Sequence, residues 1–426
     1  MAPGPDVIVV RDAGPLQGEV RVGGAKNSVL KLIAAALLAP GEHELTNVPD
    51  ISDVATMREL IAALGASSVH DPDDRSRLRI HSPAEPIPEA PYDLVERIRA
   101  SIVVLGPLLA RCGRATVSLP GGDDFGARPI DMHLKGLEAL GATFELRHGN
   151  LEGRADSGLR GDYVTLEFPS VGATENILMA AVLAKGTTVL DNAAREPEIM
   201  DLCQFLVAMG AQIEGIGTGT LTVDGVEAAD LGCVAHRVVP DRVEAATYLA
   251  AVAVAGGEVT ILDGRPEHME MYLAKLRAMG VTVTQVPGGM WCHAAGRLRS
   301  VDVATLPYPG VATDYKPLMT TMLSVADGVG IVTENLFAGR FRYVEELVRM
   351  GAQIRTDSHH AVVRGVRRLS GAPVKASDIR AGAALVVAGL AAEGETVVAG
   401  AGHVRRGYED LVGKLASLGA DVTVPS

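Results

Sequence analysis

The feature that most constrains this chain is an internal repeat that runs along its whole length. A helix-like segment ends in Leu or Met, then Gly, then Ala or Val, and an alternating strand pattern follows it. The glycines are separated by 76, 69, 70, 71 and 68 residues and stand at Gly65, Gly141, Gly210, Gly280, Gly351 and Gly419. Because glycine adopts the left-handed conformation of a helix C-cap without strain, each of them predicts the end of a helix.

A second pattern alternates with the first. A helix rich in Ala, Leu and Val runs into a glycine turn and then into a β-branched strand, and the glycines are Gly41, Gly113, Gly186, Gly257, Gly328 and Gly394. Together the two patterns predict six repeats of about 70 residues, each with two helices and several strands. The first helix of a repeat is apolar nearly all round, so we expect it to be buried, whereas the second is amphipathic.

The domain organisation follows from length and from the ends of the chain. A chain of 426 residues is too long to fold around a single hydrophobic core. We therefore expect two domains of three repeats each and an α/β fold. Strand-like segments precede the first repeat, whereas the last repeat stops abruptly near the C-terminus. We therefore expect a discontinuous domain of residues 1–25 with 237–426. The inserted domain is expected over 26–236, with a mobile loop near 119–128.

Composition excludes several classes of protein. The formal net charge is −13 and no basic stripe is present, so nucleic-acid binding is not expected. The four cysteines show no CxxC spacing, which favours reduced thiols and a cytoplasmic location. The N-terminus does not resemble a signal peptide, and no apolar run approaches about 18 residues, so no membrane association is expected. No metal site or cofactor is predicted, and the sequence leaves the oligomeric state open.

Several strings resemble the enolpyruvyl transferase family. They are GGAKN (23–27), RASIVVLGPLLAR (99–111), LPGGDDFGARPIDMH (119–133), SVGATE (170–175), NAAREPEI (192–199), TD (313–314), DIRAGAALV (378–386) and RRGYE (405–409). The resemblance covers essentially the full chain and implies a two-domain inside-out α/β barrel of six repeated β-α units. It also implies transfer of the enolpyruvyl group of phosphoenolpyruvate to a sugar hydroxyl of a uridine nucleotide. Phosphate is released through a tetrahedral ketal, without a cofactor.

The cations in these strings suit an anionic substrate. Lys26 follows Gly23-Gly24-Ala25 and opens a helix, where backbone N–H groups and the positive helix end favour an anion. The residues alone nevertheless favour a solvent-exposed lysine. The resemblance implies that Lys26, Arg128 and Arg406 clamp phosphoenolpyruvate. It implies that Arg99 and Arg380 line the same cleft. Guanidinium groups match both the phosphate and the carboxylate of this substrate.

Three carboxylates are candidates for acid–base chemistry, alongside Lys26 and Arg406. The resemblance implies that Asp314 is the base for the acceptor hydroxyl, that Asp378 supports it, and that Asp123 protonates C3 of phosphoenolpyruvate. Without the family, Asp314 reads as a cap or turn residue. Asp123 stands where the common form of the family carries a cysteine. A carboxylic acid donates a proton only if its pKa is raised, and it cannot form the stable thioether by which fosfomycin inactivates the thiol.

The nucleotide site is also assigned by resemblance. Its residues are Asn27, Arg128, Pro129, Ile130, Asp131, Met132, Ser170, Val171, Gly172, Asp314 and Arg340. Asn27 is expected to contact the acceptor sugar, the segment 128–133 the uracil, and the turn 170–172 the diphosphate. Phe168 stands where many members have a lysine, so one phosphate contact is expected to be missing.

Three departures from the family pattern cluster around the expected sugar pocket: Val311-Ala312 replaces Phe-Pro, Ala338 replaces Glu, and Arg405 replaces Asp. They leave two acceptors open. The first is the 3-hydroxyl of UDP-N-acetylglucosamine, as in peptidoglycan synthesis, and the intact uridine strings favour it. The second is the 3′-hydroxyl of UMP, as in nucleoside-antibiotic biosynthesis, and the departures favour it. A non-catalytic nucleotide-binding paralogue is a third reading, against which the retained charged residues argue.

Overall fold

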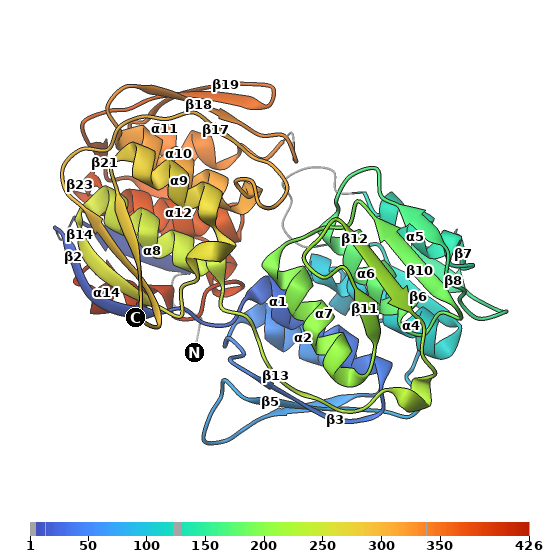
Figure 1. The fold of residues 1–426 in the computed structure, drawn as a ribbon. Helices are drawn as coiled ribbons and strands as arrows, with labels where there is room; N and C mark the ends of the chain where they lie inside the picture. The colour runs from blue at the N-terminus through green and yellow to red at the C-terminus, as the bar shows by residue number, and fades with distance from the viewer. Residues whose placement is uncertain (1–5, 13, 122–128, 338, 426) are drawn as a thin grey trace. The chain divides into compact units, whose positions relative to one another are not determined.

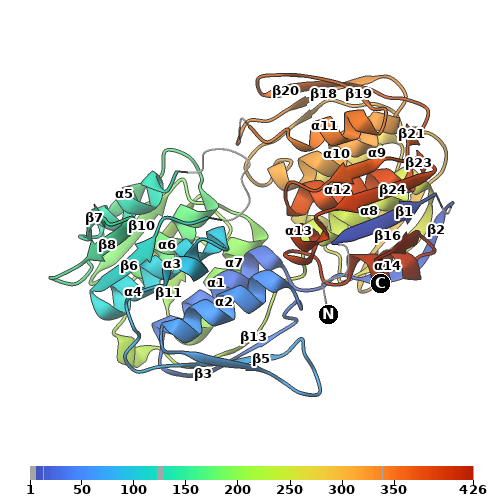
Figure 2. The ribbon, with the colours of Figure 1, turned by 180° about the vertical axis from the view of Figure 1, so that it is seen from behind.

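A computed structural model describes residues 6–12, 14–121, 129–337 and 339–425. The chain forms two compact units, seen from opposite sides in Figures 1 and 2. Unit 1 contains the described residues up to Gly23 and those from Pro240 onward, and unit 2 contains those between. In the part of the chain that is described, no helix is long and apolar enough to cross a membrane.

The sheets of unit 2 share one plan. Their strands are β3 (Gly41–Thr46), β4 (Ser67–His70), β5 (Leu78–Ser82), β6 (Arg114–Ser118), β7 (Thr143–Arg147), β8 (Asn150–Arg154), β9 (Tyr163–Thr165), β10 (Thr187–Asp191), β11 (Gln212–Glu214), β12 (Thr220–Asp224) and β13 (Ala235–Arg237). The strand after each apolar helix pairs antiparallel with a later strand of its own repeat, as β3 does with β5, β6 with β8 and β10 with β12. On their other side, β3 and β10 pair parallel with β13 and β9, which link neighbouring repeats.

The helices of unit 2 divide into an inner and an outer set. The inner set is α1 (Lys26–Ala35), α4 (Leu105–Cys112) and α6 (Val171–Ala181), and the outer set is α2 (Ser52–Ala63), α5 (Asp131–Ala139) and α7 (Pro197–Met209). Shorter segments are η1 (Ala36–Leu38), α3 (Tyr92–Val95), η2 (Arg99–Val104) and η3 (Ala228–Asp230). The inner helices pack around η1 and η2 and carry much of the apolar core of this unit.

Unit 1 repeats the same plan. Its strands are β1 (Val7–Arg11), β2 (Leu16–Arg21), β14 (Gly257–Leu262), β15 (Thr282–Val286), β16 (Gly289–Ala294), β17 (Val303–Ala304), β18 (Val329–Thr333), β19 (Gln353–Asp357), β20 (His360–Arg364), β21 (Leu369–Ser370), β22 (Pro373–Lys375), β23 (Ala392–Glu393), β24 (Glu395–Ala399) and β25 (Asp421–Thr423). The four-stranded sheets described here have the orders β15-β16-β14-β2, β17-β18-β20-β19 and β22-β24-β1-β25. The N-terminal strands thus belong to unit 1, where β1 lies between β24 and β25.

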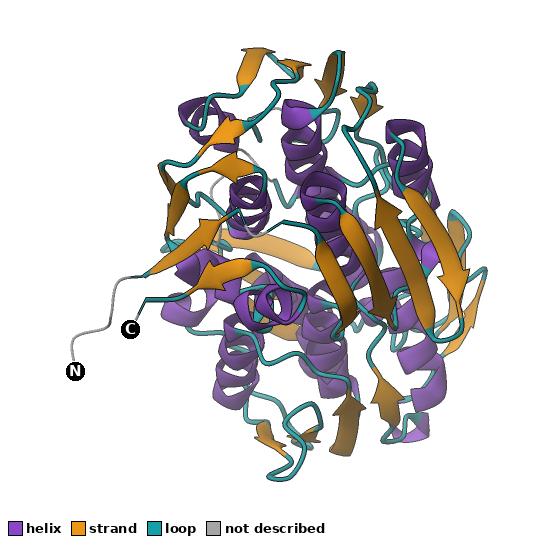
Figure 3. Cartoon of the chain, turned by 90° about the vertical axis from the view of Figure 1, so that its left-hand side faces the viewer, coloured by secondary structure: helices purple, strands orange, loops and turns teal. Residues whose placement is uncertain are grey.

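The inner helices of unit 1 are α8 (Arg242–Ala255), α10 (Lys316–Val325) and α12 (Ile379–Leu390), and they pack against one another. All residues of α12 are buried, as expected for a helix that is apolar on every side. The outer helices are α9 (Glu270–Met279), α11 (Tyr343–Arg349) and α14 (Leu411–Ser417), with the short η4 (Pro266–His268), η5 (Thr313–Tyr315) and α13 (Ala401–Arg405). Figure 3 shows strands lying outside these central helices.

Both sets of repeated glycines have the backbone conformation that the sequence predicts. The set that ends the outer helices has φ between +89° and +116°, and the set that precedes the β-branched strands has φ between +65° and +118°. Other residue types are strained in this region, so the glycines mark where each repeat must turn.

Candidate active site

Three predicted site residues meet in unit 1 at the starts of two inner helices. Asp314 lies in η5, directly before α10, and Arg380 lies in the first turn of α12. Arg340 Nη1 donates a hydrogen bond to Asp314 Oδ1 over 2.9 Å, and Arg380 Nε donates to Asp314 Oδ2 over 3.0 Å. Arg340 also donates to the Thr313 hydroxyl over 3.1 Å. A single carboxylate therefore orders two buried guanidinium groups.

This pairing sets the protonation state of Asp314. Burial raises the pKa of its carboxyl, but the charges of Arg380 and Arg340 and their hydrogen bonds outweigh burial and hold the pKa well below its usual range. Asp314 is therefore ionised, and in this arrangement it is a weak base. Asp314 lies inside the short helix η5, and its carboxylate pairs with Arg340 and Arg380.

Asp378 is the capping residue here. Its side chain accepts hydrogen bonds from the backbone nitrogens of Arg380, at 2.9 Å, and Ala381, at 3.0 Å. This N-cap fixes the first turn of α12 and thereby the base of the Arg380 side chain. The Arg380 guanidinium carbon also lies 5.5 Å from the centre of the buried Tyr408 ring. Arg406, just after α13, is half-buried two residues before that ring.

Lys26 is partly buried and ion-paired rather than fully solvated. It is the first residue of α1, and its Nζ lies 2.8 Å from Asp53 Oδ2 on α2. Lys26 is 12% exposed and Asp53 is 4% exposed, so the pair is largely shielded from water. The adjacent Asn27 is half-buried, and its carbonyl accepts a hydrogen bond from Lys31 Nζ over 3.1 Å.

Two segments of the expected nucleotide site, 129–132 and 170–172, lie at the starts of α5 and α6. Ile130 is the N-cap residue of α5, and Ser170 caps α6 by accepting from the backbone nitrogen of Ala173 over 3.3 Å. A Cβ on Gly172 would lie 2.9 Å from His133 Cε1, so the two helix starts approach closely enough to require glycine there. Val171 opens α6, and these positive helix ends suit phosphate oxygens.

His133 ties this region to Arg99. Burial and then the charge of Arg99 lower the pKa of His133 to about 4, so the ring is neutral near pH 7. Asn176 Nδ2 lies 2.9 Å from His133 Nδ1, and since an amide nitrogen only donates, Nδ1 is the acceptor. Arg99, in η2, is thereby placed near the expected uracil segment.

The remaining predicted residues are more exposed or lie outside the description. Pro129, Asp131 and Phe168 are exposed, and Met132 packs partly against the core of unit 2. Asp123, Arg128 and Ala338 lie outside the described residues.

One departure from the family pattern has a structural partner. Arg405 Nη2 donates to Asp6 Oδ1, and Asp6 also accepts from the backbone nitrogen of Gly402 at 3.1 Å. Both side chains of the ion pair are about half exposed. Arg405 therefore fastens α13 to the N-terminal segment of the same unit. Val311, by contrast, is buried in the core of unit 1.

Sequence reasoning missed two buried ion pairs beside these residues. Lys31 Nζ lies 3.2 Å from Glu175 Oε1 in unit 2, and Lys316 Nζ lies 2.8 Å from Glu334 Oε2 in unit 1. A signal for them was present, because a charged residue inside an otherwise apolar helix is rarely buried without a partner. Lys31, Glu175 and Lys316 all stand in such helices.

Comparison with known proteins identifies the family of the chain. The chain matches the family model described as EPSP synthase (3-phosphoshikimate 1-carboxyvinyltransferase) over residues 10–415. It is 53% identical to a UDP-N-acetylglucosamine 1-carboxyvinyltransferase of Nocardia farcinica, with 96% of each chain covered. It is 51% identical to the enzyme of that name from Anaeromyxobacter dehalogenans, with 98% of this chain and 99% of the relative covered.

Solved structures extend the similarity to the fold. The enolpyruvyl transferase NikO from Streptomyces tendae matches with a TM-score of 0.88 at 27% identity, covering 99% of this chain and 100% of NikO. EPSP synthase from Acinetobacter baumannii matches with a TM-score of 0.77 at 18% identity, covering 99% and 100% of the two chains, which shows a shared fold. The two-domain α/β architecture expected from the sequence is confirmed. The chain belongs to the EPSP synthase family and is an enolpyruvyl transferase.

Proposed function

We propose that this enzyme transfers the enolpyruvyl group of phosphoenolpyruvate to the 3-hydroxyl of UDP-N-acetylglucosamine and releases phosphate. The observation that carries the acceptor is the 53% identity, over 96% of both chains, to a relative named for this reaction. The chain is much less similar to NikO, at 27% identity. The matched region covers 96% of this chain and therefore extends over both units.

In the proposed mechanism, an acid protonates C3 of phosphoenolpyruvate while the acceptor oxygen attacks C2 and loses its proton to a base. The resulting tetrahedral ketal then loses a proton from C3 and expels phosphate, which restores the double bond. We assign Asp123 as the acid and Asp314 as the base. Lys26, Arg99, Arg128, Arg380 and Arg406 are assigned to the anionic groups of phosphoenolpyruvate.

The two guanidinium groups on Asp314 bear directly on its assigned role. With Arg340 and Arg380 both paired to it, the Asp314 carboxylate is too acidic to accept a proton readily. A substrate carboxylate or phosphate that binds Arg380 competes with Asp314 for the same donors. Loss of that pairing raises the pKa of Asp314, so substrate binding activates the base when the acceptor is in place.

The UMP 3′-hydroxyl remains the second candidate acceptor. Its support is the group of departures near the expected sugar pocket. The Arg405 departure does not require a different acceptor, because the ion pair of Arg405 with Asp6 explains it within unit 1. The replacement of Phe-Pro by Val311-Ala312 has no such explanation and is the change that favours UMP.

The deciding experiment is phosphate release from phosphoenolpyruvate with UDP-N-acetylglucosamine or UMP as sole acceptor. Turnover with UDP-N-acetylglucosamine alone is the expected result and identifies a peptidoglycan enzyme. Turnover with UMP alone would overturn the acceptor and retain the chemistry. Release with neither would contradict the proposed function.

We place the reaction in the cytoplasm. The support is chemical: Cys112, Cys203, Cys233 and Cys292 are free thiols, and thiols persist in a reducing compartment.

A further inference from the structure

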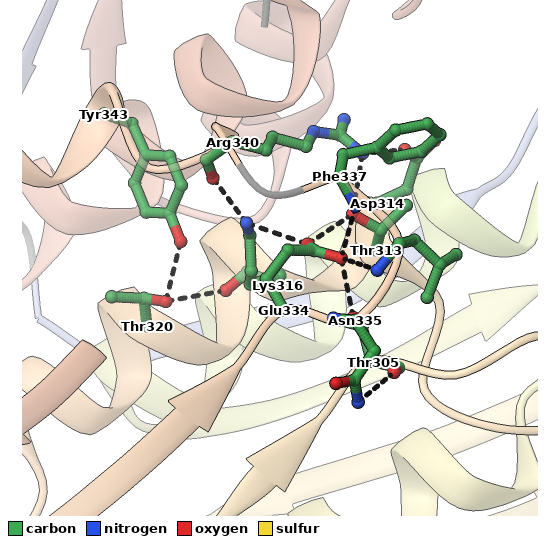
Figure 4. Close-up of polar contacts among 11 residues, drawn as sticks. Thr305, Thr313, Asp314, Lys316, Thr320, Glu334, Asn335, Phe337, Arg340 and Tyr343 are labelled. Atoms are coloured by element: carbon green, nitrogen blue, oxygen red, sulfur yellow. Dashed lines mark hydrogen bonds and ion pairs between the residues drawn. The ribbon is translucent and has the colours of Figure 1, made fainter. Parts of the chain in front are cut away.

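Lys316 is the first residue of α10, two positions after Asp314, and its side chain is fully buried. Its Nζ lies 2.8 Å from Glu334 Oε2 and donates to the carbonyl of Arg340. The same ammonium lies 4.0 Å from the centre of the Phe341 ring. Figure 4 shows Lys316 between Glu334 and the backbone of Arg340. One buried cation therefore contacts both ends of the segment 334–341.

Glu334 holds the start of the segment 334–341 through hydrogen bonds of its carboxylate. Its Oε1 accepts from the Thr305 hydroxyl at 2.7 Å and from the backbone nitrogens of Leu336, at 2.8 Å, and Phe337, at 3.2 Å. Its Oε2 accepts from the Thr313 hydroxyl at 2.7 Å. These bonds fold the chain after β18 back on itself, and they satisfy a carboxylate that is 2% exposed.

Thr313 connects this network to the proposed site. The Thr313 hydroxyl donates a hydrogen bond to Glu334. Its oxygen in turn accepts a hydrogen bond from Arg340 Nη1 over 3.1 Å. The same Nη1 donates to Asp314 over 2.9 Å. Arg340 is therefore fixed at two points: its carbonyl by Lys316, and its guanidinium by Thr313 and Asp314.

We propose that Lys316 and Glu334 form a positioning pair that sets Arg340 against Asp314 and so determines how the enzyme engages the acceptor nucleotide. This inference rests on the proposed function, because Asp314 is assigned there as the base for the acceptor hydroxyl and the family resemblance assigns Arg340 to the nucleotide. The pair touches neither substrate nor the reacting atoms in this assignment. Its effect passes through Arg340.

Physical chemistry supports a role beyond stability. A buried ion pair is often no more stabilising than an apolar pair of the same volume, because desolvation offsets the attraction. Such a pair does hold its two side chains, and the groups bonded to them, in one geometry. The reason is that a buried charge without its counter-charge is unfavourable. Here the geometry imposed is that of the loop carrying Arg340.

The charge of Lys316 is sensitive to its surroundings. The titratable and charged groups that face it in the described residues are Glu334, Arg340, Asp378 and Tyr343. Burial lowers the pKa of Lys316 to about 8, although the charge of Glu334 partly opposes the shift. Loss of this proton leaves Glu334 without its cation, so the pairing weakens as pH rises through about 8.

The test compares Lys316→Met, Glu334→Gln, the double variant and Lys316→Arg by steady-state kinetics with UDP-N-acetylglucosamine. Either single change should raise the acceptor KM about tenfold, while the phosphoenolpyruvate KM stays within about twofold. The double variant should be no worse than the poorer single variant, because the two residues act as one unit. Lys275→Met is the matched control, since this surface lysine donates to the backbone carbonyl of Asp302 at 2.8 Å.

A pH profile separates positioning from mere folding. In wild type, kcat/KM for the acceptor should fall as pH rises through about 8, and Lys316→Arg, whose guanidinium stays protonated, should lack that fall while keeping the acceptor KM low. An unchanged acceptor KM in Lys316→Met, additive single effects, or an unchanged alkaline fall in Lys316→Arg would overturn the proposal. If Lys316→Met does not fold, the acceptor KM of Glu334→Gln and the pH profile of Lys316→Arg test the proposal instead. A wild-type protein that turns over neither acceptor would instead refute the proposed function.

Discussion

Arg380 donates from Nε to Asp314 Oδ2 across 3.0 Å, although 66 residues separate the two in sequence. The contact joins the first turn of α12 to the segment before α10, so two inner helices of unit 1 present their charged ends at one place. Arg340 completes the arrangement from a third segment of the chain. This group is the best-defined part of the candidate site.

Asp314→Asn should lower kcat by about 100-fold or more, because the variant keeps the size of the side chain but loses the proposed base and one of the two acceptor oxygens. Initial rates with both substrates measure the effect. Asp327→Asn is the control, since this exposed carboxylate of the same unit pairs with Arg297 at the surface. A kcat within about twofold of wild type would remove Asp314 from the chemistry.

Asp53→Asn should raise the phosphoenolpyruvate KM by about tenfold, because Lys26 keeps its charge but loses the carboxylate 2.8 Å away that orients it. Lys26→Met should be worse, since it removes the charge itself. Asp50→Asn provides the comparison, as Asp50 is exposed and pairs with Arg75 at the surface. Equal effects of Asp53→Asn and Asp50→Asn would argue against an orienting role.

Gly172→Ala should weaken nucleotide binding by about tenfold, because the added methyl would lie 2.9 Å from His133 Cε1 and separate the starts of α5 and α6. Isothermal titration with the nucleotide reports the change. Gly219→Ala is a matched control in the same unit, since a Cβ there meets no atom within 4 Å. Unaltered affinity in Gly172→Ala would mean that this turn does not contact the nucleotide.

Glu175→Gln should change how stability depends on pH. Burial raises the pKa of Glu175 from 4.5 to about 7, with Lys31 opposing the shift. A carboxyl whose pKa is higher in the folded state contributes stability that is complete below pH 4.5 and is lost as pH rises through about 7. Relative to Glu175→Gln, wild type should lose on the order of 3 kcal/mol over this window.

Denaturant unfolding of both proteins from pH 4.5 to 8 measures that difference. Glu145→Gln is the control, because Glu145 is an exposed residue paired with Arg147. Its free energy of unfolding should follow that of wild type across the same pH range. A constant offset between wild type and Glu175→Gln across the range would show that Glu175 does not titrate there.

Asp123→Cys should make the enzyme open to time-dependent inactivation by fosfomycin, since a thiolate forms the thioether that a carboxylate does not. Asp124→Cys, one residue along, is the control and should stay resistant. Asp123→Ala should abolish turnover and leave nucleotide binding intact. Near-wild-type rates in Asp123→Ala would exclude Asp123 as the acid.

Local patterns in the sequence predicted much of the fold because they depend on neighbours along the chain. A glycine at the end of an amphipathic helix predicts where the helix stops, as Gly210 and Gly351 illustrate with φ of +116° and +89°. The burial of α12 likewise follows from its composition alone. The family strings also indicated Asp314 and Arg380, and the resemblance assigned Arg340 to the nucleotide site; these three residues do converge.

Side-chain pairs between segments distant in the sequence could not be predicted from local patterns. Nothing near Lys26 in the sequence indicates that Asp53 will be its partner, and nothing near Arg405 points to Asp6, 399 residues away. The roles of Asp314 and Asp378 were also not separable, because Asp is common both at caps and in ion pairs. Only the tertiary arrangement distinguishes the cap from the ion-paired carboxylate.

The place of β1 has a consequence for biosynthesis. This strand is synthesised before the other described helices and strands, yet its sheet neighbours β24 and β25 follow all of unit 2 in the chain. Unit 2 is complete by Val239, whereas the sheet β22-β24-β1-β25 cannot form before Glu395–Ala399 and Asp421–Thr423 have been made. The nascent protein must therefore carry Val7–Arg11 as an unpaired strand through most of its synthesis, exposed to chaperones and proteases.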